Sequence, residues 1–211
     1  MIAIVVAMKI EAQGLLKAMS QKVIISRECP FICKGTIYEK EVLLIISGVG
    51  GQVNARKTTE LILNRFTPDM VISAGIAGGT QEEINHNDIV ICQSLHSHSL
   101  VQEPIFSDEK MIELSTQVCE REELRYHIGR TLTVQKPILE SEAKRRVGNT
   151  PPFPSIVEME SYEVASVTLG KGIPFLTVRT VSDSSQENAK LDGAVDIHTL
   201  NKFILSLLEV V

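Results

Sequence analysis

The chain has 211 residues, with 21 lysines and arginines against 26 aspartates and glutamates, so its formal net charge at pH 7 is -5. Hydrophobic residues make up 44% of the chain and charged residues 22%. This balance excludes a disordered or fibrous chain and allows a full buried core. We expect one soluble domain spanning residues 1–211.

Hydropathy and charge also indicate the location of the protein and the partners it does not bind. No apolar stretch approaches the ~18 residues that a membrane span needs, and the apolar run 2–8 is too short for a secretion signal and lacks a basic segment before it. Basic residues are scattered apart from the cluster 144–146, whereas binding to duplex nucleic acid needs a concentrated cationic face. We expect a cytoplasmic protein that binds neither a membrane nor polymeric nucleic acid.

The chain has four cysteines, and none is in CxxC spacing: Cys29, Cys33, Cys92 and Cys119. We expect buried or half-buried free thiols and no disulfide framework. Cys92 with His96 and His98 is the one grouping that resembles a ligand set, but alternating histidines after a strand are more often loop residues than a zinc site. We therefore expect no metal.

Short apolar runs alternate with amphipathic stretches, which is typical of an α/β architecture with a largely buried sheet. Runs rich in Val and Ile predict strands at 2–7, 41–47, 70–74, 88–92, 131–134, 156–159 and 175–182. Mixed apolar and charged stretches predict helices at 9–19, 52–66, 108–122, 140–147 and 161–171. A last helix carries one apolar stripe: Ile197, Leu200, Phe203, Ile204, Leu207, Leu208 and Val211. Residues 36–38 indicate an antiparallel hairpin, so we expect a mixed sheet.

Candidate site residues lie where the predicted strands end. Ligands collect at the carboxyl ends of strands in α/β sheets, because loops and helix N-termini converge there. Five such ends are conspicuous: 8–11, 47–51, 75–79, 157–160 and 182–183. We expect these five loops to meet.

The glycines of 47–51 and 75–79 permit tight turns and close approach of the backbone to a ligand. A dinucleotide site would also need an acidic residue at the end of the following strand, which here ends in Ser73, Ala74 and Gly75. No GxxxxGK[ST] motif is present either. A nicotinamide cofactor and a nucleoside triphosphate are both disfavoured.

Three carboxylates lie beside apolar strand residues: Glu11, Glu160 and Asp183. Burying each of them is costly unless it has a partner or a task. Each one alone could simply cap a helix N-terminus. Three together at converging strand ends favour a site.

Five motifs, in order, resemble those of methylthioadenosine/S-adenosylhomocysteine nucleosidases of the nucleoside phosphorylase superfamily: 7–11, 47–50, 73–79, 157–160 and 179–183. The resemblance covers nearly the whole chain. It implies a single-domain, three-layer α/β fold with a central mixed, barrel-like sheet flanked by helices. It also implies a homo-oligomer, with a dimer favoured, in which the loop 96–106 is a candidate to reach a neighbour's pocket.

By this resemblance, Glu11 is the general base that takes a proton from the attacking water, and Asp183 protonates the purine at a ring nitrogen. Ser182 would orient Asp183, and Arg179 would help to position water near Glu11. Glu160 would accept hydrogen bonds from the ribose hydroxyls. The motifs imply further contacts with substrate from Met8, Val49, Ile76, Gly78, Glu158 and Met159.

The chemistry agrees with these roles. Cleavage of an N-glycosidic bond builds positive charge on the sugar and negative charge on the departing base, so a carboxylate near the ribose and an acid near the base both lower the barrier. Glu11 must be ionised, whereas Asp183 must carry a proton to donate. The implied reaction is hydrolysis of a purine nucleoside, such as a 5′-substituted adenosine, without a metal or organic cofactor.

Two stretches depart from the family pattern. Residues 75–79 lack a hydroxyl that the nucleosidases commonly have, and 133–139 stands in place of a stretch that supplies an aromatic stack for adenine. Another 5′-modified nucleoside, such as futalosine or an adenosylated lipid, therefore stays open as substrate. Phosphorolysis is less favoured, because only Lys9 and Arg56 are near the first glycine-rich turn. A nucleoside sensor without turnover is the remaining alternative.

Overall fold

The computed structural model describes residues 1–99, 101–189 and 197–211. In that part of the chain, ten strands form one mixed sheet: β1 (Ile2–Val6), β2 (Ser20–Ser26), β3 (Phe31–Ile37), β4 (Lys40–Ile46), β5 (Met70–Gly79), β6 (Ile89–Ser97), β7 (Ile105–Phe106), β8 (Tyr126–Thr133), β9 (Ile156–Glu158) and β10 (Phe175–Asp183). The helices are α1 (Lys9–Ala18), α2 (Gly51–Arg65), α3 (Glu109–Arg121), α4 (Ser141–Gly148), α5 (Ser161–Leu169) and α6 (His198–Val210).

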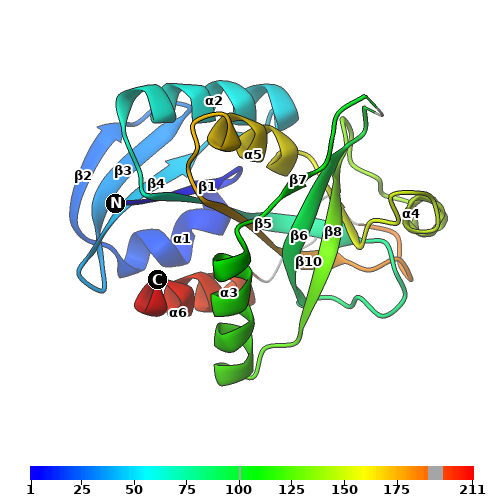
Figure 1. The fold of residues 1–211 in the computed structure, drawn as a ribbon. Helices are drawn as coiled ribbons and strands as arrows, with labels where there is room; N and C mark the ends of the chain where they lie inside the picture. Colours follow the sequence, from blue (N-terminus) through cyan, green and yellow to red (C-terminus); the bar gives the residue numbers. More distant parts are fainter. Residues whose placement is uncertain (100, 190–196) are drawn as a thin grey trace.

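The sheet is closed at one end and open at the other (Figure 1). Strand β10 pairs in parallel with β5 and antiparallel with β6, and β8 and β9 complete the ring back to β5. From β5 the sheet continues outward through β1, β4, β3 and β2. The predicted mixed, barrel-like sheet and the hairpin between β3 and β4 are thus confirmed.

The glycine-rich segment 75–79, expected to be a loop, is instead the second half of β5. It pairs with β10 along one side and with β9 on the other. None of its glycines has a positive φ angle, so they do not form a turn. Their lack of a Cβ instead leaves room for neighbouring side chains. In the other glycine run, Gly48 and Gly51 do have positive φ, at 84° and 53°, as expected for a turn.

Other strands also differ from the prediction: β8 begins at Tyr126 and not at residue 131, and β7 was not predicted. Strand β6 continues to Ser97, so His96 lies in a strand and not in a loop. Strand β2 was not predicted, because it is a mostly exposed edge strand with no buried run to mark it.

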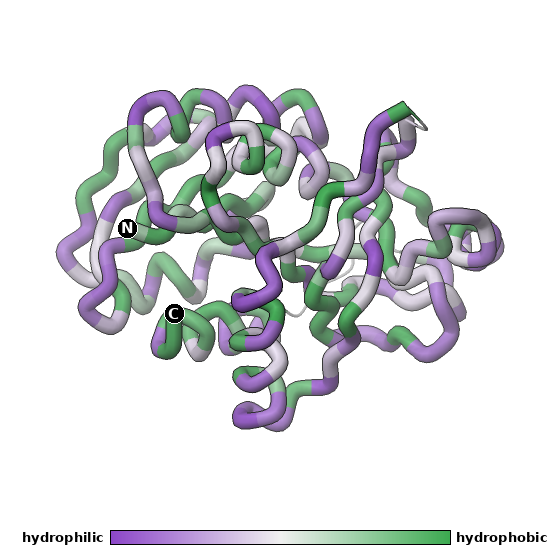
Figure 2. Tube along the Cα trace, viewed as in Figure 1, coloured by the Kyte–Doolittle hydropathy of each residue, from purple (hydrophilic) through white to green (hydrophobic). Residues whose placement is uncertain are grey.

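Helices cover both faces of the open part of the sheet, which makes three layers (Figure 1). On β1, Ile2, Ile4 and Val6 pack in the cluster that contains α1, α3 and α6, whereas Ala3 and Val5 pack against α2 and α5. Alternate residues of a strand face opposite sides, so a strand covered on both faces is apolar throughout. Figure 2 shows this as hydrophobic strands inside more hydrophilic helices.

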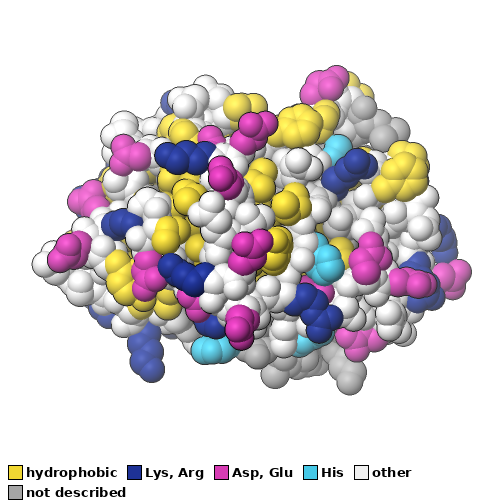
Figure 3. Space-filling model, turned by 60° about the horizontal axis from the view of Figure 1, so that its bottom comes forward, with side chains coloured by type: hydrophobic (Ala, Val, Ile, Leu, Met, Phe, Trp, Pro, Cys, Tyr) yellow, Lys and Arg dark blue, Asp and Glu magenta, His cyan; other side chains and the backbone are white. Residues whose placement is uncertain are grey.

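The exposed face seen in Figure 3 carries hydrophobic side chains among charges of both signs. On the face shown in Figure 3, lysine and arginine side chains are interspersed with acidic ones and do not form a continuous basic area. None of the helices among the described residues is both long and apolar enough to cross a membrane.

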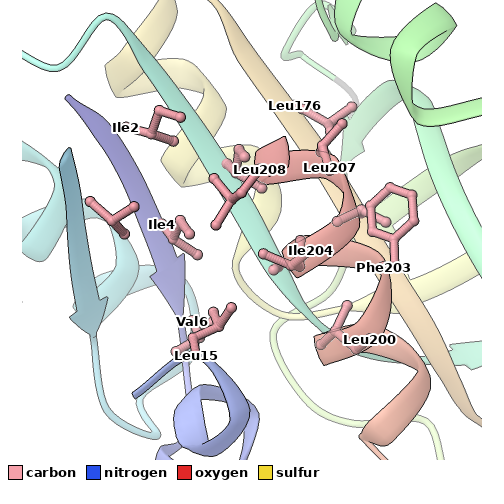
Figure 4. Close-up of a cluster of buried hydrophobic side chains, with 14 of the residues drawn as sticks. Ile2, Ile4, Val6, Leu15, Leu176, Leu200, Phe203, Ile204, Leu207 and Leu208 are labelled. Carbon is pink, nitrogen blue, oxygen red and sulfur yellow. The ribbon is translucent and has the colours of Figure 1, made fainter. Parts of the chain in front are cut away.

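The C-terminal stripe closes the core as predicted. Leu200, Phe203, Ile204, Leu207 and Leu208 are each at most 1% exposed. Figure 4 shows them facing β1, Leu15 of α1 and Leu176 of β10. This helix seals one face of the sheet, and the carboxyl ends of the strands are left for the site.

Candidate active site

One cavity of about 450 Å³ collects residues from all five strand-end motifs. Its lining includes ten of the eleven residues that the sequence singled out: Met8, Glu11, Val49, Ile76, Gly78, Glu158, Met159, Glu160, Ser182 and Asp183. The expected convergence of Glu11, Glu160 and Asp183 on one space is therefore confirmed. Arg179 is the exception and lies behind the cavity wall.

Glu11 lies in the first turn of α1 and folds back over the N-terminus of its own helix. Its Oε2 accepts hydrogen bonds from the backbone N–H groups of Ala7 (3.0 Å) and Met8 (2.7 Å), and its Oε1 accepts one from Ile76 (3.1 Å). The side chain thus caps the helix and also joins α1 to β5 at the cavity. Glu11 therefore caps the helix and also lines the cavity, so the two interpretations of this carboxylate are compatible.

The environment of Glu11 favours its protonated form more than water does. The residue is only 2% exposed, and burial raises the pKa of its carboxyl although the three backbone donors and the charge of Arg179 act in the opposite direction. A carboxylate with a raised pKa is a stronger base, as abstraction of a proton from water requires.

Arg179 and Glu158 form a buried ion pair beneath the cavity. Arg179 NH2 lies 3.1 Å from Glu158 Oε2, and the two side chains are 3% and 1% exposed. The guanidinium also donates to Ser73 O, Ser73 Oγ and Ser161 Oγ. Strands β5, β9 and β10 and helix α5 are joined at this one group.

Glu158 has protein partners on both carboxylate oxygens. Oε1 accepts a hydrogen bond from Thr133 Oγ1, and Oε2 accepts from the backbone N–H groups of Glu160 (2.8 Å) and Ser161 (2.7 Å) as well as from Arg179. It lines the cavity, but its oxygens hold the start of α5. Its geometry is that of a support for Glu160.

The Glu160 carboxylate has far fewer protein partners than that of Glu158, with a backbone hydrogen bond from Met159. Burial, followed by the negative charges of Glu158 and Glu11, raises its pKa to about 7, although Arg179 acts against this. Burial and its acidic neighbours thus favour the neutral form of Glu160 more than water does.

Ser182 and Asp183 end β10 at the cavity. Ser182 Oγ is 2.7 Å from Asp183 Oδ1 and 3.1 Å from Ala77 O. The other oxygen, Oδ2, receives a hydrogen bond of 2.5 Å from Lys144 Nζ on α4. The expected Ser182–Asp183 contact is present, and the lysine is an addition that the sequence did not indicate.

A second, very small cavity adjoins Glu11. It measures about 10 Å³, close to the space one water molecule occupies, and Arg179, Ser73, Ser47 and Glu160 are among its lining residues. Arg179 thus reaches the neighbourhood of Glu11 through this cavity and not through the large one.

Part of the cavity wall comes from segments that the sequence did not mark as site residues: His86, Val134, Pro137, Ile138, Leu139, Glu187, Asn188 and Ala189. Only 133–139 carried a signal, as the stretch that departs from the family pattern. The contact of Ala189 N with Leu139 O (2.8 Å) brings two of these segments together, which no local pattern could predict.

The cysteines are free. Cys33, Cys92 and Cys119 are buried as expected, but Cys29 is exposed. Cys92 Sγ contacts Val90 O, and His96 Nε2 contacts Ser94 Oγ. Within 1–99, 101–189 and 197–211, no group of three or more His, Cys, Asp or Glu side chains could hold a metal ion.

Comparison with known proteins places the chain in a family. The model of the phosphorylase superfamily matches residues 1–205. The chain belongs to the phosphorylase superfamily. The resemblance inferred from the five motifs is confirmed.

Individual members of the superfamily are similar over the full chain. The 5′-methylthioadenosine/S-adenosylhomocysteine nucleosidase of Staphylococcus aureus strain JH9 is 29% identical over an alignment of 205 residues. The alignment covers 90% of this chain and 90% of that protein. The crystal structure of the nucleosidase of that name from Neisseria meningitidis, with methylthio-immucillin-A, has a TM-score of 0.90 at 24% identity and covers 100% of this chain and 99% of that one. A futalosine hydrolase mutant of Helicobacter pylori also has a TM-score of 0.90, at 22% identity, with the same coverage.

The raised pKa of Glu160 predicts how stability depends on pH. The folded protein holds this proton more tightly than the unfolded chain, so folding is disfavoured progressively as pH rises from 4.5 to about 7. Glu160→Gln removes this penalty. We expect the variant to have the wild-type Tm near pH 4.5 and a Tm several degrees higher at pH 8, since ~1 kcal/mol shifts Tm by about 2–4 °C in a chain of this size.

The matched control is Glu163→Gln, one turn along α5, where the carboxylate pairs with Arg56 at 3.0 Å. This variant should show no such gain at pH 8. Thermal unfolding at both pH values checks the prediction, and an equal Tm difference for Glu160→Gln at the two pH values would contradict it.

Proposed function

We propose that the protein hydrolyses the N-glycosidic bond of a purine nucleoside, a 5′-substituted adenosine such as methylthioadenosine or S-adenosylhomocysteine, and releases free base and sugar. Two observations support this: the Staphylococcus aureus relatives that match over 90% of the chain carry the name of that nucleosidase, and the cavity has the chemistry the reaction needs.

The observation that carries the choice of hydrolysis is the charge of the cavity. Its described lining includes five carboxyl side chains and neither lysine nor arginine: Glu11, Glu158, Glu160, Asp183 and Glu187. Such a wall repels a phosphate ion and attracts the positive charge that develops on a departing sugar. Among the nearby cations, Lys9 is exposed, Arg56 pairs with Glu60 and Glu163, and Arg179 is held in its buried ion pair with Glu158 beside a cavity that has room only for water. Water is therefore the better acceptor than phosphate.

In the proposed reaction each acid has a separate task. The small cavity beside Arg179 adjoins Glu11 and has room for one water molecule. In the proposed reaction, Glu11 takes a proton from this water as its oxygen attacks the anomeric carbon. Glu160 accepts hydrogen bonds from the ribose hydroxyls, and its charge stabilises the sugar cation. Asp183, which lines the same cavity, gives a proton to the purine ring as the bond breaks.

The apolar part of the cavity suits the uncharged parts of such a substrate. Met8 and Met159 are close in sequence to Glu11 and Glu160, and Val49 lines the same cavity. We assign these three side chains to the ribose and its 5′ substituent. Val134, Ile138 and Leu139 provide aliphatic surface for a flat base. No Phe, Tyr or Trp is among the described lining residues, so the base would pack against aliphatic side chains.

A panel of nucleosides tests the proposal directly. We expect release of free base from methylthioadenosine or adenosylhomocysteine at the same rate with and without phosphate, as followed by chromatography. Glu11→Gln and Asp183→Asn should each lower kcat about 10²–10⁴-fold while the folded state persists, because each removes one proton transfer.

Inosine and futalosine complete the panel, since a futalosine hydrolase shares the fold. Base release from futalosine alone would move the assignment to that substrate, and release that depends on phosphate would reject hydrolysis. Tight binding of methylthioadenosine with no release would identify a sensor.

Gly75 generates a second kinetic prediction. A Cβ at this position would lie 2.8 Å from Glu11 Oε1, so Gly75→Ala must displace the carboxylate. We expect a loss of about 10²-fold in kcat, as for other small misplacements of a reacting group. In the control Gly170→Ala, the new Cβ has only an ordinary contact of 3.4 Å with Ser166 O, and wild-type kcat in Gly75→Ala would contradict the prediction.

We also propose that two copies of the chain associate through the side that carries α2 and the tip of β6 and β7. Apolar side chains are exposed there, including Val53 (60%), Val101 (91%) and Phe106 (63%). Gln52 on α2 contacts His98 beyond β6 at 3.3 Å, so the two segments are adjacent (Figure 1). Exposed apolar surface of this kind marks contact sites between proteins.

Light scattering tests the association. Wild type should have twice the chain mass of 23.3 kDa, and the double variant Val53→Asp with Val101→Asp should have the mass of one chain. Val23→Asp is the control, because Val23 is equally exposed (60%) but lies on the edge strand β2. A double variant that stays dimeric would show that the interface lies elsewhere.

A further inference from the structure

Lys144 is a fully buried lysine with no task in the mechanism so far. It is 0% exposed and lies on α4, where the only other buried residue is Gly148. Its ammonium nitrogen is 2.5 Å from Asp183 Oδ2 and 2.6 Å from Ser184 O. The side chain thus ends directly behind the proposed acid.

The surroundings of the Lys144 side chain suit a charged group. Packing alone would be served by a methionine or leucine, and burial of an ammonium is unfavourable unless it is paired. The backbone also makes room for the pair, because Gly78 lacks the Cβ that would lie 3.2 Å from Asp183 Oδ2 and 3.6 Å from Lys144 Cδ. Asp183 lines the cavity, whereas Lys144 does not.

We propose that Lys144 is the source of the proton that Asp183 delivers to the purine, an inference that rests on the proposed hydrolysis. In the resting enzyme the pair is an ammonium and a carboxylate. As the bond from the anomeric carbon to the base breaks, its electron pair goes to the base. Lys144 transfers its proton to the Asp183 carboxylate, and Asp183 transfers a proton to a ring nitrogen of the base, which leaves a neutral lysine and an aspartate carboxylate.

The cycle balances with water as the one co-reactant. Hydroxide from the attacking water bonds to the anomeric carbon, and the proton removed from that water goes to Glu11. After release of the base, Glu11 gives its proton to solvent and the neutral Lys144 amine takes one up. Lys144 acts through Asp183 and is a positioning residue in this scheme.

A change of leaving group separates this role from a structural one. A 5′-methylthio riboside of 4-nitrophenol has the same sugar, but its leaving group departs as a stable anion and needs no proton. For Lys144→Met we expect kcat/KM to fall about 10²-fold with methylthioadenosine and less than about 3-fold with the nitrophenyl riboside. Asp183→Asn should show the same selectivity.

The chain offers a matched control in Arg145. Its NH1 donates to Ser185 O at 2.6 Å, so it fixes the same segment from the same helix but does not contact Asp183. Arg145→Met should leave the ratio of the two activities unchanged. Lys144→Gln, which keeps a donor for Ser184 O but has no acidic proton, replaces Lys144→Met if the latter does not fold.

The pH profile is the second readout. If Lys144 supplies the proton, its loss should move the alkaline limit of kcat with methylthioadenosine to lower pH. The other titratable groups around Asp183 line the same cavity or neighbour Lys144 on α4: Glu11, His86, Glu158, Glu160, Glu187 and Arg145. These are unchanged in the variant.

The outcomes distinguish this inference from the proposed function. If wild type releases no base from any nucleoside, the proposed function fails. If wild type is active but the Lys144 variants lose both activities equally, or lose neither, only the role of Lys144 is overturned.

Discussion

The buried pair of Arg179 and Glu158 is the interaction on which the site depends. It ties β10 to β9 and, through Ser73 and Ser161, to β5 and α5. Removal of one member of such a pair leaves a buried charge without its partner, which typically costs about 3–5 kcal/mol. Glu158 in turn holds the first N–H groups of α5, so the pair fixes Glu160 at the cavity wall.

Two acids of the cavity wall, Glu158 and Asp183, are each paired with a buried cation. Acids line the cavity, and the cations that balance them lie behind the wall: Arg179 beneath Glu158 and Lys144 behind Asp183. A substrate therefore meets only carboxylates among the described ionised groups of the wall. Such a surface stabilises a developing sugar cation and disfavours an anionic acceptor, while the buried cations keep the acids from destabilising the fold.

Glycine allows the acids to lie this close to the strands. Gly75 leaves space for the carboxylate of Glu11, and Gly78 leaves space for Asp183 and the stem of Lys144. The glycine-rich motif is therefore needed in an extended strand, where the absence of a side chain matters more than freedom of φ. Its interpretation as a turn was wrong for 75–79 and right for Gly48 and Gly51.

The sequence by itself determined the class of fold, the helices, most strands and the three acids of the site, because these depend on local periodicity and on motifs of a few residues. It could not determine that 75–79 is a strand, that β2 forms an edge, or that Glu158 is held by protein groups. Lys144 looked like one of three basic residues in a surface cluster, since nothing local shows that its side chain is buried beside a residue 39 positions away. Those features depend on which distant segments pair around the barrel, and only the tertiary structure brings their atoms together.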